Sequence, residues 1–234
     1  MPLIAVEQLT FRYPGGAVVL EGVSLAVERG ERVALLGATG AGKSTLLQHL
    51  NALLTPGAGH VVVDGLVVGP DTAREVRRRV GLVFQDPDDQ LFLPTLLEDV
   101  AFGPLNDGAP PADAEARALR VLAELGLEGA HSRAAHHLSG GERRLAALAT
   151  VLVSAPLVLA LDEPSGDLDA RGRRRLVTLL RARKETLIVA THDLEFARML
   201  CDRAVLLADG RVGWDGRFQE LLASPLLLER YGLA

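Results

Sequence analysis

Short apolar runs mark the N-terminal part of the chain. The runs at 3–7, 17–27 and 32–36 have the length and bounding turn residues of β-strands. "HVVVDG" and "GLVVG" predict a hairpin that turns at Asp64-Gly65. We therefore expect an N-terminal subdomain of antiparallel β-structure.

In the second half of the chain, apolar strands alternate with helices. The strands "LVLAL", "TLIVA" and "AVLLA" are separated by a predicted helix over about 170–183 and another that begins at Leu194. Alternation of this kind is typical of a parallel sheet with helices on both faces. The pattern predicts an α/β fold with a parallel-sheet core.

The middle of the chain has a different character. Residues 87–140 are rich in proline, alanine and histidine, and Ala118, Leu119, Leu122 and Leu125 recur at helical spacing. We interpret this segment as an inserted helical subdomain. Within a single domain of 1–234, residues 1–86 and 156–234 would form the sheet-containing core and residues 87–155 the helical subdomain.

One uncharged stretch, residues 145–161, resembles a membrane span. It falls short of the ~20 residues that a spanning helix needs, and Pro156 interrupts it. We expect a helix that ends near Ser154 and then a buried strand. The N-terminus lacks the basic and apolar regions of a signal peptide, so the chain is expected to be soluble.

Net charge and cysteine content limit the classes of partner and the cellular compartment. The net charge of −5 excludes a general basic footprint for nucleic acid. Cys201 is the single cysteine, so an internal disulfide is impossible, which fits a reducing compartment.

Residues 37–45, "GATGAGKST", combine small residues with a lysine and two hydroxyls. They fit G-x-x-x-x-G-K-[ST] and lie between the strand "RVALL" and a helix predicted over about 42–53. Small residues let backbone N–H groups surround a phosphate at a helix N-terminus, and a plain glycine-rich turn would need neither lysine nor hydroxyl. Lys43 is suited to the β- and γ-phosphates, and Ser44 to Mg²⁺. The predicted nucleotide-binding residues of this loop are Gly37, Thr39, Gly40, Ala41, Gly42, Lys43, Ser44 and Thr45.

An apolar strand ends in two carboxylates at "LVLALDEP", residues 157–164. Asp162 is placed to hold the Mg²⁺ shell, and Glu163 to polarise water as a general base. A solvated strand-end turn is the alternative interpretation, which the preceding phosphate loop makes less attractive.

"LSGGE", residues 138–142, opens a long helix. Ser139 and Glu142 form a capping box, which explains these two residues but not Gly140 and Gly141 between them. The two glycines would expose N–H groups at a helix start, which is a second anion site.

Taken together, these motifs resemble the ATP-binding-cassette (ABC) ATPases over nearly the whole chain. The loop at 37–45 resembles their Walker A motif, "LVLALDE" their Walker B motif and "LSGGE" their signature motif. "LVFQD", "SGDLD" and "ATHD" resemble the Q-loop, the D-loop and the switch-histidine segment. The resemblance implies a P-loop NTPase fold with ATP as substrate and Mg²⁺ as cofactor.

The resemblance also implies roles for individual residues. Tyr13 would stack on adenine, Gln85 would link Mg²⁺ and water to a transmembrane partner, and His192 would contact the γ-phosphate. Two ATPs would lie between paired subunits, so that Ser139, Gly140 and Gly141 serve a nucleotide held by the partner. Glu142 of the signature motif and Asp169 of the D-loop are also expected among the nucleotide-binding residues. The family usually has glutamine at the position of Glu142 and a small pair at Gly166-Asp167. We expect the first departure to be mild and the second to alter communication between the two sites.

A narrower resemblance rests on "GLVFQDPDDQLF", "EDVAFGPLN" and "HHLSGGE". These segments resemble the energy-coupling-factor ATPases, especially the cobalt- and nickel-uptake type. The implied protein is an ATPase on the cytoplasmic face of the cell membrane that powers an importer of cobalt or nickel ions or of vitamins. Its partners would be a second ABC ATPase subunit, identical or different, a transmembrane coupling subunit gripped by the helical insertion, and a substrate-binding membrane subunit.

Two other classes of protein fit the sequence less well. A soluble ABC ATPase that acts on nucleic acid or ribosomes usually has two cassettes or a long coiled-coil insertion, and this sequence has neither. A P-loop kinase would lack "LSGGE", Gln85 and His192. The transporter ATPase therefore remains the leading hypothesis.

Overall fold

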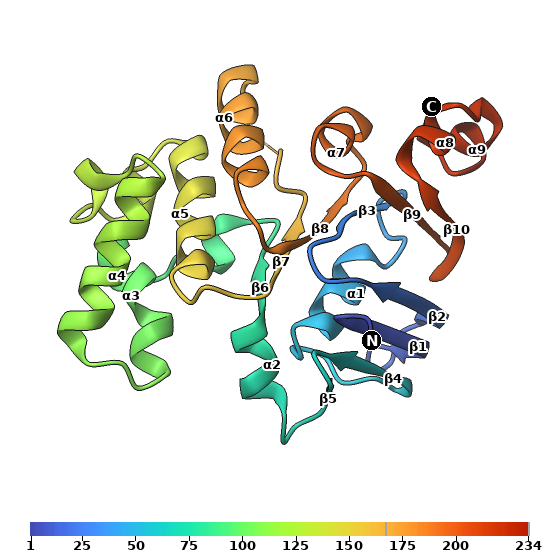
Figure 1. The fold of residues 1–234 in the computed structure, drawn as a ribbon, viewed down its shortest axis with the longest axis horizontal. Coiled ribbons are helices and arrows are strands. Elements are labelled where there is room, and N and C mark those ends of the chain that lie inside the picture. The colour runs from blue at the N-terminus through green and yellow to red at the C-terminus, as the bar shows by residue number, and fades with distance from the viewer. Residues whose placement is uncertain (167, 234) are drawn as a thin grey trace. The chain divides into compact units, whose positions relative to one another are not determined.

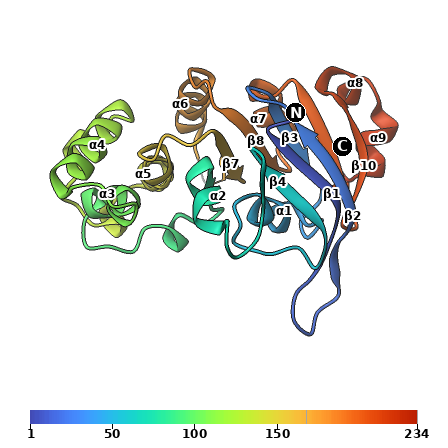
Figure 2. The same cartoon turned by 60° about the horizontal axis from the view of Figure 1, so that its bottom comes forward.

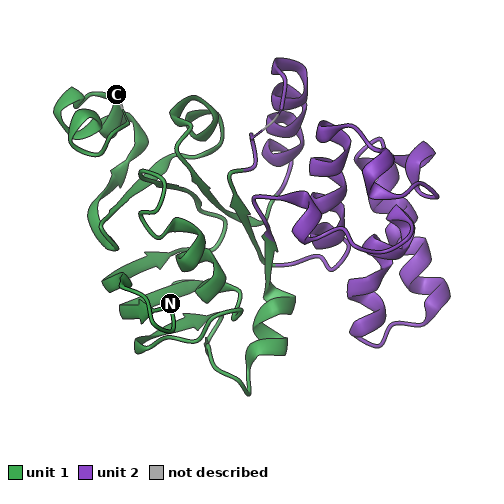
Figure 3. Cartoon of the chain, turned by 180° about the vertical axis from the view of Figure 1, so that it is seen from behind, with its two compact units in different colours: residues 1–82, 157–163, 184–234 green, residues 83–156, 164–183 purple. Residues whose placement is uncertain are grey.

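The computed structural model describes residues 1–166 and 168–233 and divides into two compact units (Figure 3). The sheet unit comprises residues 1–82, 157–163 and 184–234, and the helical unit comprises residues 83–156 and 164–183. Asp167, which belongs to the atypical pair noted in the sequence, lies outside the described residues.

The larger sheet has the strand order β10-β9-β3-β8-β7-β6 (Figure 1). Pairing is parallel between β3 and both β8 and β9, and between β7 and β8, whereas β10 is antiparallel to β9. The predicted parallel core is therefore confirmed, with an antiparallel strand added at one edge. Its strands are β3 (Arg32–Leu36), β6 (Val80–Val83), β7 (Val158–Asp162), β8 (Thr186–Thr191), β9 (Arg203–Ala208) and β10 (Arg211–Arg217).

The smaller sheet is antiparallel, as predicted, with the order β2-β1-β4-β5. Asp64 and Gly65 between its last two strands have φ values of 48° and 81°. These left-handed residues suit a two-residue hairpin turn, whose twist matches that of the strands. The four strands are β1 (Ile4–Arg12), β2 (Val18–Val27), β4 (Ala58–Val63) and β5 (Leu66–Val67).

Helix α1 (Lys43–Leu50) lies between the two sheets of the sheet unit. It packs on β7 and β8 of the larger sheet and on β2 and β4 of the smaller one. The helix ends three residues before the predicted Leu53, because Ala52 has a left-handed φ of 58° that an α-helix cannot include.

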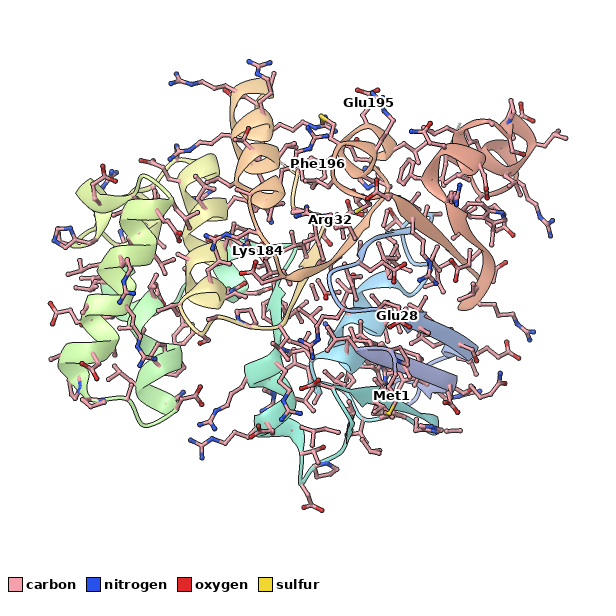
Figure 4. All side chains as sticks on the ribbon, viewed as in Figure 1. Met1, Glu28, Arg32, Lys184, Glu195 and Phe196 are labelled. Atoms are coloured by element: carbon pink, nitrogen blue, oxygen red, sulfur yellow. The ribbon has the colours of Figure 1, made fainter. Side chains whose placement is uncertain are left out.

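Helix α7 (Leu194–Leu200) packs on β3 and β8, and Figure 1 shows it across the larger sheet from α1. Figure 4 shows Glu195 and Phe196 on different sides of this helix. Phe196 is fully buried, so its ring anchors α7 to the core. Helix α2 (Ala73–Arg79) precedes β6.

Three helices form the centre of the helical unit: α3 (Leu96–Asn106), α4 (Pro111–Glu124) and α5 (Gly140–Leu152). They pack against one another in all pairs. A short 3₁₀ turn at Pro87–Asp89 precedes α3, and two more at Glu128–Ala130 and Ala135–His137 lie between α4 and α5. Helix α6 (Ala170–Arg181) belongs to the same unit, and Arg183 beyond its end pairs with Glu124 of α4 at 3.0 Å.

The uncharged stretch 145–161 is divided as the sequence predicts. Helix α5 ends at Leu152, and the buried strand β7 begins at Val158. Among the described residues, no helix is both long and apolar enough to cross a bilayer.

The C-terminal elements β10, α8 (Phe218–Leu222) and α9 (Pro225–Arg230) are not predicted by the sequence pattern. Strand β10 has no fully buried residue, and Gly213 and Gly216 interrupt its apolar alternation. The two helices are too short to show a helical period.

Asp99 ties the loop before α3 to that helix. Its Oδ1 accepts hydrogen bonds from the N–H groups of Phe92 and Leu93, both at 3.0 Å. The side chain is buried, and Oδ2 has no hydrogen bond from any described residue. Burial raises the pKa of Asp99, although these two N–H bonds oppose the shift.

We expect Asp99→Asn to stabilise the protein at neutral pH. The raised pKa means that the fold favours the protonated carboxyl, a contribution that is lost as pH rises through the folded-state pKa. Asparagine keeps the acceptor oxygen and carries no charge. Urea unfolding at pH 7.5 should give a higher midpoint for the variant, and the difference should shrink towards pH 4. A lower midpoint for Asp99→Asn at both pH values would contradict this account.

Candidate functional site

The parallel register aligns the carboxyl ends of three neighbouring strands in the sheet unit. Leu36 at the end of β3 pairs with Thr191 at the end of β8, and Asp162 at the end of β7 pairs with Ala190. The N–H of Glu163 then donates to the carbonyl of Ala190 at 2.8 Å. The segments that follow these strands therefore begin along the edge formed by the carboxyl ends of the strands, which is the usual place for ligands in α/β proteins.

Two positions of the loop that follows β3 require glycine. A Cβ on Gly37 would lie 2.2 Å from the carbonyl oxygen of Leu207. Gly42 has a φ of 101°, and a Cβ there would lie 2.8 Å from a methyl group of Leu20. Gly42 is also the N-cap of α1 and provides no side chain to bond the first N–H groups. Those N–H groups remain available to an anion.

Lys43 is buried inside its own loop. Its Nζ donates to the carbonyls of Gly37 at 2.8 Å and Ala38 at 3.1 Å, and lies 3.7 Å from Glu163 Oε1. A buried ammonium needs such partners, because burial without them is costly. The same charge can bind phosphate oxygens by exchanging loop carbonyls for them.

Glu163 stands at the centre of the polar groups at this edge. Its Oε1 lies 3.1 Å from Nδ1 of His192, and its Oε2 accepts the hydroxyl of Thr191 at 2.7 Å. Its φ is 41°, a strained value for a residue other than glycine. The structure thus brings together Lys43, Glu163 and His192, three of the residues selected from the sequence, and adds Thr191, which was not selected.

The oxygen donors of the sheet unit suit a magnesium ion. Asp162 is buried at the end of β7, and the partly exposed Ser44 lies in the first turn of α1. A carboxylate and a hydroxyl, completed by water and phosphate oxygens, form the kind of ligand set that Mg²⁺ prefers. These residues therefore fit the ion that the sequence analysis expects.

Tyr13 lies in the connection between β1 and β2, which Figure 2 shows extending beyond the strands. Its hydroxyl lies 3.3 Å from both Thr45 Oγ1 and Gln48 Oε1 of α1. Its ring meets Phe11 edge-on at 5.0 Å, and Phe11 meets His49 at 4.6 Å. Burial lowers the pKa of His49, so this ring favours the neutral form. Tyr13 is thus held beside the phosphate loop, with its side chain 38% exposed.

The other predicted site residues belong to the helical unit. Ser139 caps α5 through a complete capping box, in which its N–H donates to Glu142 at 2.8 Å. This hydrogen bond lowers the pKa of Glu142. Gly140 and Gly141 form the first turn of the helix, where Gly140 is exposed and Gly141 partly so.

A cavity of about 490 Å³ in the helical unit opens between the starts of α5 and α6. Asp169 contributes to it and caps α6 by accepting the N–H of Gly172 at 2.7 Å. The predicted site residues that line the cavity are Ser139, Gly141, Glu142 and Asp169.

Gln85 is exposed, and its backbone carbonyl accepts a hydrogen bond from Arg144 of α5 at 2.6 Å. Arg144 is buried and also reaches the carbonyl of Gly166 at 3.3 Å. One arginine thus joins the segments of three predicted motifs. The sequence analysis did not select Arg144, because the pair Arg143-Arg144 does not indicate which guanidinium is buried.

Residues 20–166 match the family described as "ABC transporter". The chain is 51% identical to a putative ABC transporter ATP-binding protein of Streptomyces avermitilis, over 99% of this chain and 88% of that protein. It is 46% identical to the cobalt import ATP-binding protein CbiO of Rhodobacter capsulatus, over 99% and 85% of the two chains. It is 42% identical to the energy-coupling factor transporter ATP-binding protein EcfA of Methanothermobacter thermautotrophicus, over 99% and 76%.

Solved structures similar to this chain also belong to ABC transporter proteins. CbiO1 of Clostridium perfringens, described as part of the ABC transporter complex cbiONQ, superposes with a TM-score of 0.84 at 34% identity. The alignment covers 99% of this chain and 95% of that one. The dimeric bacterial ABC transporter cassette MJ0796 gives 0.83 at 29% identity, over 92% and 98% of the two chains. The α/β fold with its N-terminal antiparallel sheet is therefore that of the ABC ATPases.

Proposed function

Because the chain belongs to the ABC transporter family and is an ATPase, we propose that it powers a membrane importer of the energy-coupling-factor type. The transported solute would be a cobalt or nickel ion or a vitamin. The observation that carries the catalytic part is the contact of Glu163 with Lys43 and His192 at the end of the parallel strands. The similarity to CbiO and EcfA supports the choice of importer.

In the proposed reaction, the site binds ATP mainly by its triphosphate. Lys43 exchanges loop carbonyls for β- and γ-phosphate oxygens, and the first N–H groups of α1 bind the same anion. Tyr13 contributes a ring for the adenine, since its side chain is exposed beside Thr45. Binding therefore uses groups that the fold already holds in place.

Glu163 acts as the general base. Its carboxylate takes a proton from water, the water oxygen bonds to the γ-phosphorus, and the bond from that phosphorus to the bridging oxygen of ADP breaks. His192 contacts the γ-phosphate from its place beside Glu163. Ser44 and Asp162 of the sheet unit would hold Mg²⁺, which neutralises phosphate charge when bound.

We propose that a second ABC ATPase subunit completes the site through its own signature segment. The capped, exposed start of α5 offers Ser139, Gly140 and Gly141 to an anion, and Asp169 lies at the same cavity. The dimeric cassette MJ0796 supports this pairing.

The membrane partner would dock on the helical unit. Phe92 and Phe102 are 64% and 41% exposed, and their rings meet at 5.5 Å. Two exposed aromatic side chains in contact are typical of an interaction site and fit an apolar coupling segment of a transmembrane subunit. The ATPase would then act at the cytoplasmic face of the membrane as a peripheral subunit.

Glu163→Gln should lower kcat for ATP hydrolysis by about 10²–10⁴-fold, because the amide cannot accept the proton of water. ATP binding, measured by equilibrium titration, should stay intact. Glu195→Gln, on the exposed surface of α7, is the matched control and should leave turnover unchanged. Normal turnover in Glu163→Gln would remove Glu163 as the base.

Mixing a Lys43→Ala chain with a Ser139→Ala chain should restore turnover that neither chain shows alone. Each mixed dimer would contain about one intact site, because the two defects fall in the same one of its two sites. ATPase activity across a titration of the two chains measures the recovery. Absence of any recovery would argue against shared sites.

The import function is tested with the chain purified from membranes together with its partners and reconstituted into vesicles. We expect ATP-dependent accumulation of cobalt or nickel ions or of a vitamin, and its loss with Glu163→Gln. ATPase activity that responds to RNA or ribosomes, with no solute accumulated, would instead favour the soluble class of ABC ATPase.

A further inference from the structure

We propose that Thr191 is a positioning residue for ATP hydrolysis, whose hydroxyl fixes both the carboxylate of Glu163 and the turn that carries His192. This inference rests on the proposed function, in which Glu163 accepts a proton from water. Thr191 itself is not assigned any contact with ATP.

The hydroxyl of Thr191 makes two hydrogen bonds of fixed direction. It lies 3.0 Å from the backbone N–H of Asp193 and 2.7 Å from Oε2 of Glu163. The N–H can only donate, and the ionised carboxylate can only accept. The single hydroxyl hydrogen must therefore point at Glu163. Thr191 is fully buried, so water does not replace either partner easily.

Glu163 needs a partner on this side because its other oxygen faces cationic or ionisable groups. Oε1 lies 3.7 Å from the ammonium of Lys43 and 3.1 Å from the ring of His192. Without the hydroxyl, the carboxylate is free to rotate both of its oxygens towards Lys43. A base that turns away from water by even about 1 Å can lose about 10²-fold in rate.

The second hydrogen bond closes the turn around His192. Asp193, which donates its N–H to Thr191, also caps α7 by accepting the N–H of Phe196 at 2.9 Å. His192 is therefore held between two anchored neighbours while its own side chain is 69% exposed. One hydroxyl thus orients the base and supports the backbone of the residue next to it.

Strand β8 supplies its own control for this proposal. Thr186, at the opposite end of the strand, is also buried, and its hydroxyl accepts the N–H of Gly30 at 2.8 Å. Both threonines lie on β8, both are buried, and each has a hydroxyl that is hydrogen-bonded. They differ in their partners, because the hydroxyl of Thr186 bonds Gly30 and that of Thr191 bonds Glu163. Valine has the shape of threonine without the hydroxyl, so the same substitution can be compared at both positions.

We expect Thr191→Val to lower kcat by about 10–100-fold, the loss that corresponds to one hydrogen bond to a charged group. KM and the equilibrium Kd for ATP should stay within about twofold, because the phosphate loop is untouched. Thr191→Ser, which keeps the hydroxyl, should restore most of the rate. Thr186→Val should lower Tm by about 2–4 °C, as Thr191→Val does, but keep the wild-type kcat.

A double-mutant cycle with Glu163→Gln separates positioning from a general loss of structure. Thr191→Val should have little further effect on residual turnover in the Glu163→Gln background. If Thr191→Val does not fold, Thr191→Cys retains a similar size with a weaker donor and should give an intermediate kcat.

Three results would overturn the inference: wild-type kcat in Thr191→Val, an equal kcat loss in Thr186→Val, or full additivity with Glu163→Gln. These results are distinct from a failure of the proposed function. If Glu163→Gln alone keeps normal turnover, the base assignment fails. If Glu163→Gln is inactive and Thr191→Val is normal, the inference about Thr191 fails by itself.

Discussion

The register between β3, β8 and β7 is the constraint on which the grouping of Lys43, Glu163 and His192 depends. Leu36 pairs with Thr191, and Glu163 continues the pairing of β7 by bonding Ala190. If one strand slipped by one residue, every side chain of that strand would move to the opposite face of the sheet. These strands are apolar on both faces, so what opposes a slip is the cost of moving the polar residues at their ends, such as Asp162 and Thr191, away from their partners. The packing of the strands thus fixes the positions of the polar groups at their carboxyl ends.

Charge compensation is the second requirement at this edge. Lys43 is 6% exposed, and its hydrogen bonds reach two carbonyls of its own loop, with Glu163 nearby. These partners offset the cost of burying an ammonium. They are also groups that phosphate can displace, because a phosphate oxygen offers a stronger, charge-assisted bond. The loop therefore compensates the charge of Lys43 through groups that a phosphate can replace.

Features encoded within a few consecutive residues could be predicted from the sequence. The glycines at 37 and 42, the capping box of Ser139 and Glu142, and the hairpin at Asp64-Gly65 depend on local backbone geometry. The contact between Thr191 and Glu163 joins residues 28 positions apart and depends on strand register, which the sequence pattern does not specify. The burial of Arg144 rather than Arg143 follows from packing of α5 against its neighbours, which is likewise a tertiary property.

The strained backbone of Glu163 is explained by this same tertiary framework. A φ of 41° costs free energy in a glutamate and persists only where surrounding interactions determine the conformation. Here its N–H bonds Ala190 and its carboxylate bonds Thr191, so both ends of the residue are attached to β8. Lys43 is held mainly by the carbonyls of Gly37 and Ala38, and Glu163 is a more distant partner at 3.7 Å. In the proposed function, the orientation of the base therefore depends chiefly on β8 and the affinity for the triphosphate chiefly on the loop after β3, so a change on β8 should alter the rate of hydrolysis more than nucleotide binding.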